Sequence, residues 1–114
     1  IEFHPSLYQQ EILEYCDDNN IVLTAYSPLA QGVDLNIPVI EELAEEYGRS
    51  ASQIVLRWIM HKDAVPIPRS KDPKHIKDNF GALSFELEEG DVEKINKLHK
   101  NNRVVNPSFS DFDY

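Results

Sequence analysis

The sequence has few of the residues that would point to a secreted, membrane-bound or nucleic-acid-binding protein. A single cysteine, Cys16, cannot form an internal disulfide, which favours a reducing, cytoplasmic setting. No apolar run approaches the roughly 18 residues of a membrane span, and no signal peptide opens the chain. Only 11 lysines and arginines stand against 20 acidic residues, a net charge of −9 that argues against a nucleic-acid partner. Small anionic ligands are not excluded, because they respond to local charge.

The sequence also lacks the motifs of several kinds of catalytic site and of a metal site. The sequence contains no phosphate-binding P-loop, no glycine-rich dinucleotide fingerprint and no Ser-His-Asp arrangement. No two histidines are spaced as zinc ligands usually are, so no metal site is expected; they are His4, His61, His75 and His99. We interpret His4, which precedes a proline, as structural.

The residues present, 41% of them hydrophobic, suffice for one α/β domain. Ile21 to Ser27 is an apolar run without alternation, ended by Pro28, which predicts a strand buried on both faces. A second short strand is predicted over residues 64–67, and Ile1 to Phe3 resembles the end of a third. Since the chain starts with Ile1 inside this strand-like stretch, we expect it to be a segment of a longer protein, with the missing part on the N-terminal side.

Helices are predicted between and after these strands. One begins at Ser6, with Tyr8, Ile12, Tyr15 and Cys16 on its apolar face. The others are expected over residues 38–47, from Ser50 with a capping box to Gln53, from Asp72 and Pro73, and from Glu88 onward. Residues from about 101 to 114 are expected to form a tail. Alternating strands and helices indicate parallel strands joined by crossovers, but so few strands cannot close a sheet.

Polar groups follow both predicted strands and define the candidate site. Tyr26 and Ser27 follow the first strand, and Arg69 and Ser70 follow the second, just before a helix that starts with lysines. A cation, a hydroxyl and the free N–H groups of a helix start are typical of a phosphate site. The alternatives are a solvated helix start and a core tyrosine with a satisfied hydroxyl.

Taken together, the motifs resemble the C-terminal portion of the aldo-keto reductases. The matching phrases are IEFHP from Ile1, AYSPLAQG from Ala25, QIVLRW from Gln53, PIPRS from Pro66 and HIKDNF from His75. The resemblance implies that residues 1–114 form part of an eight-stranded TIM (β/α)8 barrel, from the end of strand six through strand eight and the tail. The loop after Gly32 is short, as in the compact prokaryotic-type members.

The resemblance also implies a function: reduction of small aldehydes or ketones with NADPH, with NADH as a possible substitute. The tyrosine at 26 would stack on the nicotinamide, and Arg69 would hold the 2′-phosphate. His75 stands where an arginine is common, which weakens the expectation of strict NADPH preference. The full set of expected cofactor contacts is Tyr26, Ser27, Leu29, Gln31, Arg69, Ser70, Lys71, His75, Asp78 and Asn79.

The four catalytic residues of the family would lie outside these 114 residues, so this segment alone is expected to be inactive. Two other interpretations stay open. One is a catalytically inactive barrel that binds a nucleotide or a partner protein. The other is a half-barrel that pairs with a second copy through its open strand edges.

Overall fold

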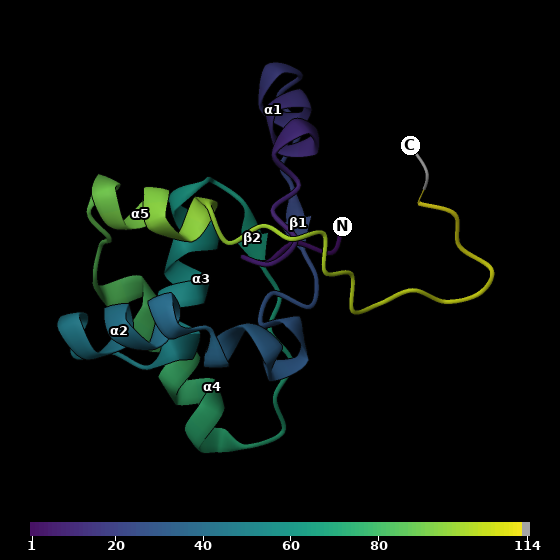
Figure 1. The fold of residues 1–114 in the computed structure, drawn as a ribbon. Coiled ribbons are helices and arrows are strands. Elements are labelled where there is room, and N and C mark those ends of the chain that lie inside the picture. Colours follow the sequence, from purple (N-terminus) through teal and green to yellow (C-terminus); the bar gives the residue numbers. More distant parts are fainter. Residues whose placement is uncertain (113–114) are drawn as a thin grey trace.

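The computed structural model describes residues 1–112 as helices packed beside a small open sheet (Figure 1). Residues 113 and 114, the end of the predicted tail, lie outside the described residues. The elements in chain order are α1 (Gln10–Asp18), β1 (Thr24–Ala25), η1 (Ala30–Asn36), α2 (Pro38–Tyr47), α3 (Ala51–His61), β2 (Val65–Pro66), α4 (Pro73–Phe80), η2 (Gly81–Ser84) and α5 (Glu89–Asn96). The predicted α/β class and the order of its elements are confirmed.

The sheet consists of β1 and β2, which are parallel, with Thr24 opposite Val65 and Ala25 opposite Pro66. An isolated parallel bridge joins Glu2 to Tyr26 on the other side of β1. The strand end predicted at the N-terminus is present only as this bridge, which lies next to β1. The sheet is open, as its small number of strands requires.

The prediction that residues 21–27 form a strand buried on both faces is wrong. Only Thr24 and Ala25 form β1, and Val22 is 70% exposed while its neighbour Leu23 is 5% exposed. The helices cover one face of this segment and leave the other uncovered, so burial alternates along it. The unbroken apolar run in the sequence did not reveal this alternation.

The prediction for the first helix was wrong at its start and on one face. Helix α1 begins at Gln10, because His4 and Leu7 close a tight backbone turn with N–O distances of 2.9 and 3.4 Å. Tyr15, predicted to face inward, is 64% exposed, whereas Leu13 is buried. The turn precedes the helix start, and Tyr15 lies on the side of α1 that faces solvent.

The remaining helices begin and end where local chemistry predicts. Pro38 lies at the start of α2, and Gly48 ends it in the left-handed conformation at φ 62°. Ser50 and Gln53 form the predicted capping box of α3. Asp72 caps α4 by accepting a hydrogen bond from the Lys74 N–H at 2.9 Å.

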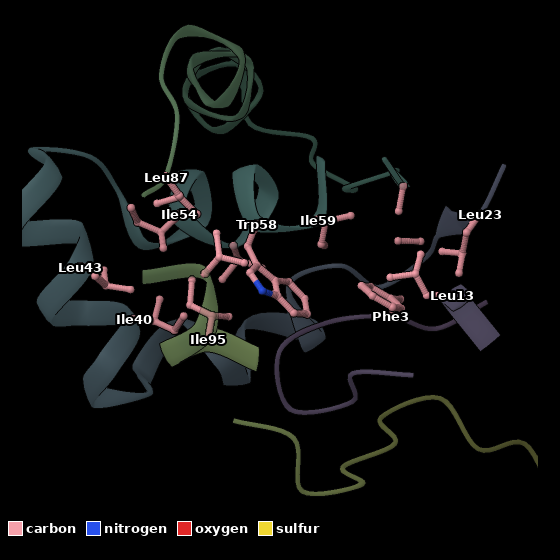
Figure 2. Packing of buried hydrophobic residues seen from close by; sticks show 14 residues of the cluster. Phe3, Leu13, Leu23, Ile40, Leu43, Ile54, Trp58, Ile59, Leu87 and Ile95 are labelled. Carbon is pink, nitrogen blue, oxygen red and sulfur yellow. The ribbon is translucent and has the colours of Figure 1, made fainter. Parts of the chain in front are cut away.

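Helix α3 lies at the centre of the packing and contacts α2, α4, η2 and β2. Its Trp58 is fully buried and stacks on Phe3 with ring centroids 5.5 Å apart (Figure 2). Tyr8 meets the indole edge-on with centroids 5.3 Å apart. Ile95 of α5 lies in the same cluster. Trp58 is thus a packing residue, as predicted, and it joins the N-terminal segment to the helices.

The N-terminus of α3 also holds α4 and η2 in place. Gln53 accepts a hydrogen bond from the Ser50 N–H at 3.1 Å and donates one to the backbone oxygen of Asp78 at 2.7 Å. A methyl group added at Gly81 would overlap the Gln53 amide nitrogen. Gly81 therefore leaves the room that the Gln53 side chain needs to make both bonds.

We expect opposite effects from alanine at two helical glycines. Gly81→Ala should lower the free energy of unfolding by about 1–2 kcal/mol, because the buried side chain of Gln53 must give up hydrogen bonds. Gly90→Ala is the matched control, since nothing lies within 4 Å of its added methyl group. It should raise the free energy of unfolding by roughly 0.5–1 kcal/mol through the better helix propensity of alanine. Urea denaturation measures both, and destabilisation of equal size would contradict the account of Gly81.

Candidate functional site

The segments that follow β1 and β2 leave the sheet at the same edge. The Val65 N–H donates to the Leu23 oxygen at 2.9 Å, and the Ile67 N–H donates to the Ala25 oxygen at 3.0 Å. Since the strands are parallel and in register, Tyr26 and Ser27 follow one strand where Ile67 and Pro68 follow the other. This edge is the carboxyl end of the strands, where α/β proteins place their ligand sites.

The backbone of Tyr26 is fixed from the N-terminal side. Its N–H donates to the Ile1 oxygen at 2.8 Å, and its oxygen accepts from the Phe3 N–H at 3.3 Å. The side chain is half-buried, and within residues 1–112 its hydroxyl has no hydrogen-bond partner. A core tyrosine with a satisfied hydroxyl, the alternative considered from the sequence, does not match this environment.

The loop after Tyr26 has an unusual density of left-handed backbone. Ser27, Ala30 and Gln31 have φ of 47°, 50° and 54°, and Gly32 has φ of 91°. Left-handed backbone at a residue other than glycine costs on the order of 1 kcal/mol or more, and such residues gather at ligand sites. The loop turns sharply, with the Ala30 N–H donating to the Ser27 oxygen at 2.9 Å. Leu29 and Gln31, two of the expected contacts, are held in this turn.

The segment after β2 is cationic and faces solvent. Arg69 and Lys71 are exposed, and within residues 1–112 neither side chain has an ion-pair or hydrogen-bond partner. The Ser70 hydroxyl accepts a hydrogen bond from the Asp72 N–H at 3.1 Å. Both cations therefore precede the capped N-terminus of α4 with their charges uncompensated, an arrangement suited to a phosphate group.

The second half of α4 carries the other expected contacts, and one of them is already bonded. The Ser50 hydroxyl donates to the Asp78 carboxylate at 2.5 Å, so this acid is held by the N-terminus of α3. His75 is exposed, with its Nε2 4.0 Å from the Asp72 carboxylate, and Asn79 is half-buried. Asp78 thus has a structural partner that its position in the sequence did not indicate.

A buried polar cluster beside the site was not predicted from the sequence. The side chains of Glu2, His4, Ser6 and Asp34 are all fully buried, and His4 lies between the two carboxylates. The structural role predicted for His4 agrees with this burial. The spacing of Glu2 and His4, two residues apart, places both on one face of a strand and could have suggested that they act together.

The charge state of this cluster follows from its contacts. Burial alone would lower the pKa of His4, but hydrogen bonds to Asp34 and Glu2 and their negative charges outweigh it and raise that pKa. Burial would raise the pKa of Asp34, but its bonds with His4 and Ser6 lower it. The geometry therefore favours an imidazolium held by carboxylates.

A separate hollow of about 620 Å³ lies between α1, α5 and the C-terminal segment. Tyr8, Glu11, His99 and Arg103 are among its lining residues, and none of the expected cofactor contacts belongs to it. The expected contacts are instead half-buried or exposed residues of the segments that follow β1 and β2 and of α4, an open surface. A two-stranded sheet gives such a surface no opposite wall.

Two further questions about residues 1–112 are whether a helix could span a membrane and whether a group of side chains could hold a metal ion. No helix in that range is long and apolar enough to cross a membrane. The same range contains no group of three or more histidine, cysteine, aspartate or glutamate side chains placed to hold a metal ion.

Comparison with known proteins gives consistent matches. The family model described as "Aldo/keto reductase family" matches residues 34–100. An uncharacterised oxidoreductase of Bacillus subtilis, YtbE, is 40% identical over 114 residues, which is 100% of this chain and 40% of that protein. The glyoxal reductase of the same organism is 40% identical over 104 residues, 91% of this chain and 38% of its own. The chain thus spans about two fifths of the length of these curated relatives.

Solved structures give the same result for the fold. An aldo-keto reductase from a Medee basin deep-sea metagenome library, MGS-M4, superposes with a TM-score of 0.90 at 30% identity. That match covers 99% of this chain and 42% of the other. A mutant of Gox0644 in complex with NADPH superposes with a TM-score of 0.89 at 28% identity, covering 98% and 42% of the two chains.

The strained loop yields a test by glycine substitution. Gln31→Gly should leave the free energy of unfolding unchanged or raise it by up to about 1 kcal/mol, because glycine adopts positive φ without strain. Glu45→Gly, at an exposed position inside α2, is the control and should lower it by roughly 1 kcal/mol. Thermal and urea unfolding of the two variants measure the difference. A loss of equal size at both positions would show that Gln31 carries no backbone strain.

Proposed function

Because the chain belongs to the aldo/keto reductase family, we propose that it supplies most of the cofactor site of an NADPH-dependent carbonyl reductase. Its fold is part of the TIM (β/α)8 barrel of that family, seen here with an open sheet. The assignment of residues 1–114 to the end of strand six through strand eight and the tail stays a prediction. The substrate would be a small aldehyde or ketone.

The observation that carries this proposal is the shared edge of β1 and β2. The in-register pairing brings a half-buried aromatic residue, Tyr26, and a cationic segment beginning at Arg69 to neighbouring strand ends. NADPH presents complementary features: a flat nicotinamide ring at one end, a pyrophosphate in the middle and a 2′-phosphate on the adenosine at the other end. The residues present therefore fit the cofactor.

Local charge supports the phosphate half of the proposal. Residues 69–77 contain Arg69, Lys71, Lys74 and Lys77 against a single acid, Asp72, in a chain with 20 acidic residues. The two cations nearest β2 have no partner within residues 1–112. A guanidinium binds phosphate oxygens through paired hydrogen bonds, which makes Arg69 the leading candidate for the adenosine 2′-phosphate.

The remaining contacts would come from the loop and from α4. Ser27, Leu29 and Gln31 would follow the pyrophosphate, and Ser70 and Lys71 would assist Arg69. His75, Asp78 and Asn79 would surround the adenine. Because Asp78 is tied to Ser50, its expected effect is to fix this part of α4 rather than to contact the ligand strongly.

When bound, the cofactor supplies a hydride to the carbonyl carbon, and a proton must reach the carbonyl oxygen from a positioned acid. We assign none of the described residues to that acid. This chain's part in the reaction is to bind the dinucleotide and orient its nicotinamide through Tyr26.

The charge of Arg69 should distinguish the two cofactors. Arg69→Ala should weaken NADPH binding by about 1.5–3 kcal/mol, as expected for charged hydrogen bonds, and leave NADH binding nearly unchanged. This equals a rise in Kd of roughly 10- to 150-fold, measured by fluorescence titration of the 114-residue chain. Lys97→Ala removes an exposed cation from the end of α5 and serves as the control. Equal losses for NADPH and NADH would refute the 2′-phosphate assignment.

The absence of an assigned acid gives a second prediction. The pure 114-residue chain should bind NADPH yet oxidise none of it with glyoxal or another small aldehyde, followed at 340 nm, roughly where reduced nicotinamide absorbs. Sustained turnover would show that a residue of this chain acts as the catalytic acid. Failure to bind NADPH, NADH or adenosine 2′,5′-bisphosphate would instead reject the cofactor site.

A further inference from the structure

The proposed function leaves unexplained the cluster formed by Glu2, His4, Ser6 and Asp34, which we call the buried acid–histidine cluster. All four side chains are fully buried, although charged residues are rarely buried without a specific reason. None of them belongs to the expected cofactor contacts. Their partners lie in three separate stretches of the chain.

One arm of the cluster holds the loop after Tyr26. Asp34, in η1, accepts hydrogen bonds from the Ser6 N–H at 2.9 Å and from the Ser6 hydroxyl at 2.6 Å. The His4 Nδ1 lies 3.1 Å from the same carboxylate. Because η1 also contains Ala30 and Gln31, these bonds fix the end of the strained turn.

The other arm holds the C-terminal segment, which runs past the N-terminal strand and β1 (Figure 1). The Glu2 carboxylate accepts hydrogen bonds from the N–H groups of Val104 at 2.8 Å and Val105 at 2.9 Å. The backbone oxygen of Ser6 accepts two more, from the N–H groups of Lys100 at 3.1 Å and Asn102 at 3.0 Å.

His4 connects the two arms. Its Nε2 lies 2.7 Å from the Glu2 carboxylate, while its Nδ1 faces Asp34. An imidazolium donates from both nitrogens, whereas a neutral ring would turn a lone pair toward one of the carboxylates. Since the cluster is fully buried, loss of charge at one arm changes the energy of the other.

We propose that Glu2, His4 and Asp34 are positioning residues that couple the C-terminal segment 100–105 to the loop 27–36. The coupling stands on these contacts alone. Its consequence for the cofactor rests on the proposed function, in which Ser27, Leu29 and Gln31 follow the pyrophosphate. A docked C-terminal segment then keeps this loop in its binding shape.

The coupling has a defined pH range. The raised pKa of His4 means that its contribution is complete below about pH 6.5 and is lost as the pH rises through that raised value. The lowered pKa of Asp34 means that its contribution is complete above about pH 4 and is lost as the pH falls through that lowered value. The ionisable side chains that hydrogen-bond to His4 are Glu2 from its own segment and Asp34 from η1, and the C-terminal segment adds backbone N–H groups.

Amide hydrogen exchange of the 114-residue chain tests the coupling directly. Asp34→Asn alters the bonds of the loop arm to His4 and Ser6 and touches neither Val104 nor Val105. It should nevertheless lower the protection of the Val104 and Val105 amides by about tenfold. The amides of Trp58 and Ile59 in α3 report global opening, so the loss of protection at Val104 and Val105 should exceed any loss at these two amides. Asp91→Asn is the control, because Asp91 accepts a hydrogen bond from the Tyr47 hydroxyl at 2.6 Å outside the cluster. Unchanged protection at Val104 and Val105 in Asp34→Asn would overturn the coupling.

A double substitution separates charge coupling from simple damage. His4→Gln leaves two buried carboxylates without a counter-charge, so protection should fall at Gly32 and at Val105 together. Adding Asp34→Asn to His4→Gln removes one of those charges and should restore part of the protection. If these variants do not fold, the unmodified chain still decides the question. Intrinsic-rate-corrected protection at Gly32 and Val105 should then fall in parallel above pH 6.5, roughly the ordinary histidine pKa, and independent changes would contradict the proposal.

NADPH titration of Glu2→Gln tests the consequence for binding. This variant alters the bonds of Glu2 to Val104, Val105 and His4 and has no side-chain contact with the loop 27–36. Its Kd for NADPH should nevertheless rise by about three- to tenfold. An unchanged Kd in a variant that has lost Val104 and Val105 protection would overturn the positioning role. If the unmodified chain does not bind NADPH, the proposed function fails, and the exchange data still decide the coupling.

Discussion

The burial of α3 is the constraint on which the arrangement of the other elements depends. The hydrogen-bonded ladder between β1 and β2 has only two residues on each strand, too few to be stable alone in water. Helix α3 compensates by placing Ile54, Trp58 and Ile59 against the N-terminal segment, α2 and α5 (Figure 2). Full burial of each such side chain contributes roughly 1.5–3 kcal/mol. The strand ends that carry the candidate site are therefore held by helix packing more than by the sheet.

The same helix also sets the orientation of α4, through polar contacts at its N-terminus. Ser50 is the N-cap of α3: its hydroxyl accepts a hydrogen bond from the Gln53 N–H and donates one to the Asp78 carboxylate. The Arg49 guanidinium donates to the Ser84 hydroxyl at 2.9 Å. Helix α4 has no buried residue, so packing alone cannot fix its position. A mostly solvated helix held at one end in this way can present its other end, with the cations after β2, to a ligand.

The sequence predicted what depends on local chemistry and missed what depends on distant partners. The capping box of Ser50, the N-cap at Asp72 and the left-handed Gly48 follow from residue type and were confirmed. The exposure of Val22 depends on which sheet face the helices cover, and the late start of α1 depends on the turn at His4. The first cause is not visible in a local window, whereas the second is an exception, because the turn between His4 and Leu7 is local. The cluster of Glu2 with Asp34 joins residues far apart in the chain, so only the folded structure reveals it. The cofactor contacts came from family resemblance and stay predictions.

The net charge of −9 opposes a polyanionic cofactor only if charges act over long distances. At physiological ionic strength the Debye length is about 8 Å, so a phosphate at the strand ends responds mainly to its nearest neighbours. Those neighbours include Arg69 and Lys71, whose charges are unpaired within residues 1–112. Two of the acids, Glu2 and Asp34, are instead buried with His4, which compensates part of their charge. An acidic chain can thus present a local cationic edge, and composition alone is a weak guide to what such a chain binds.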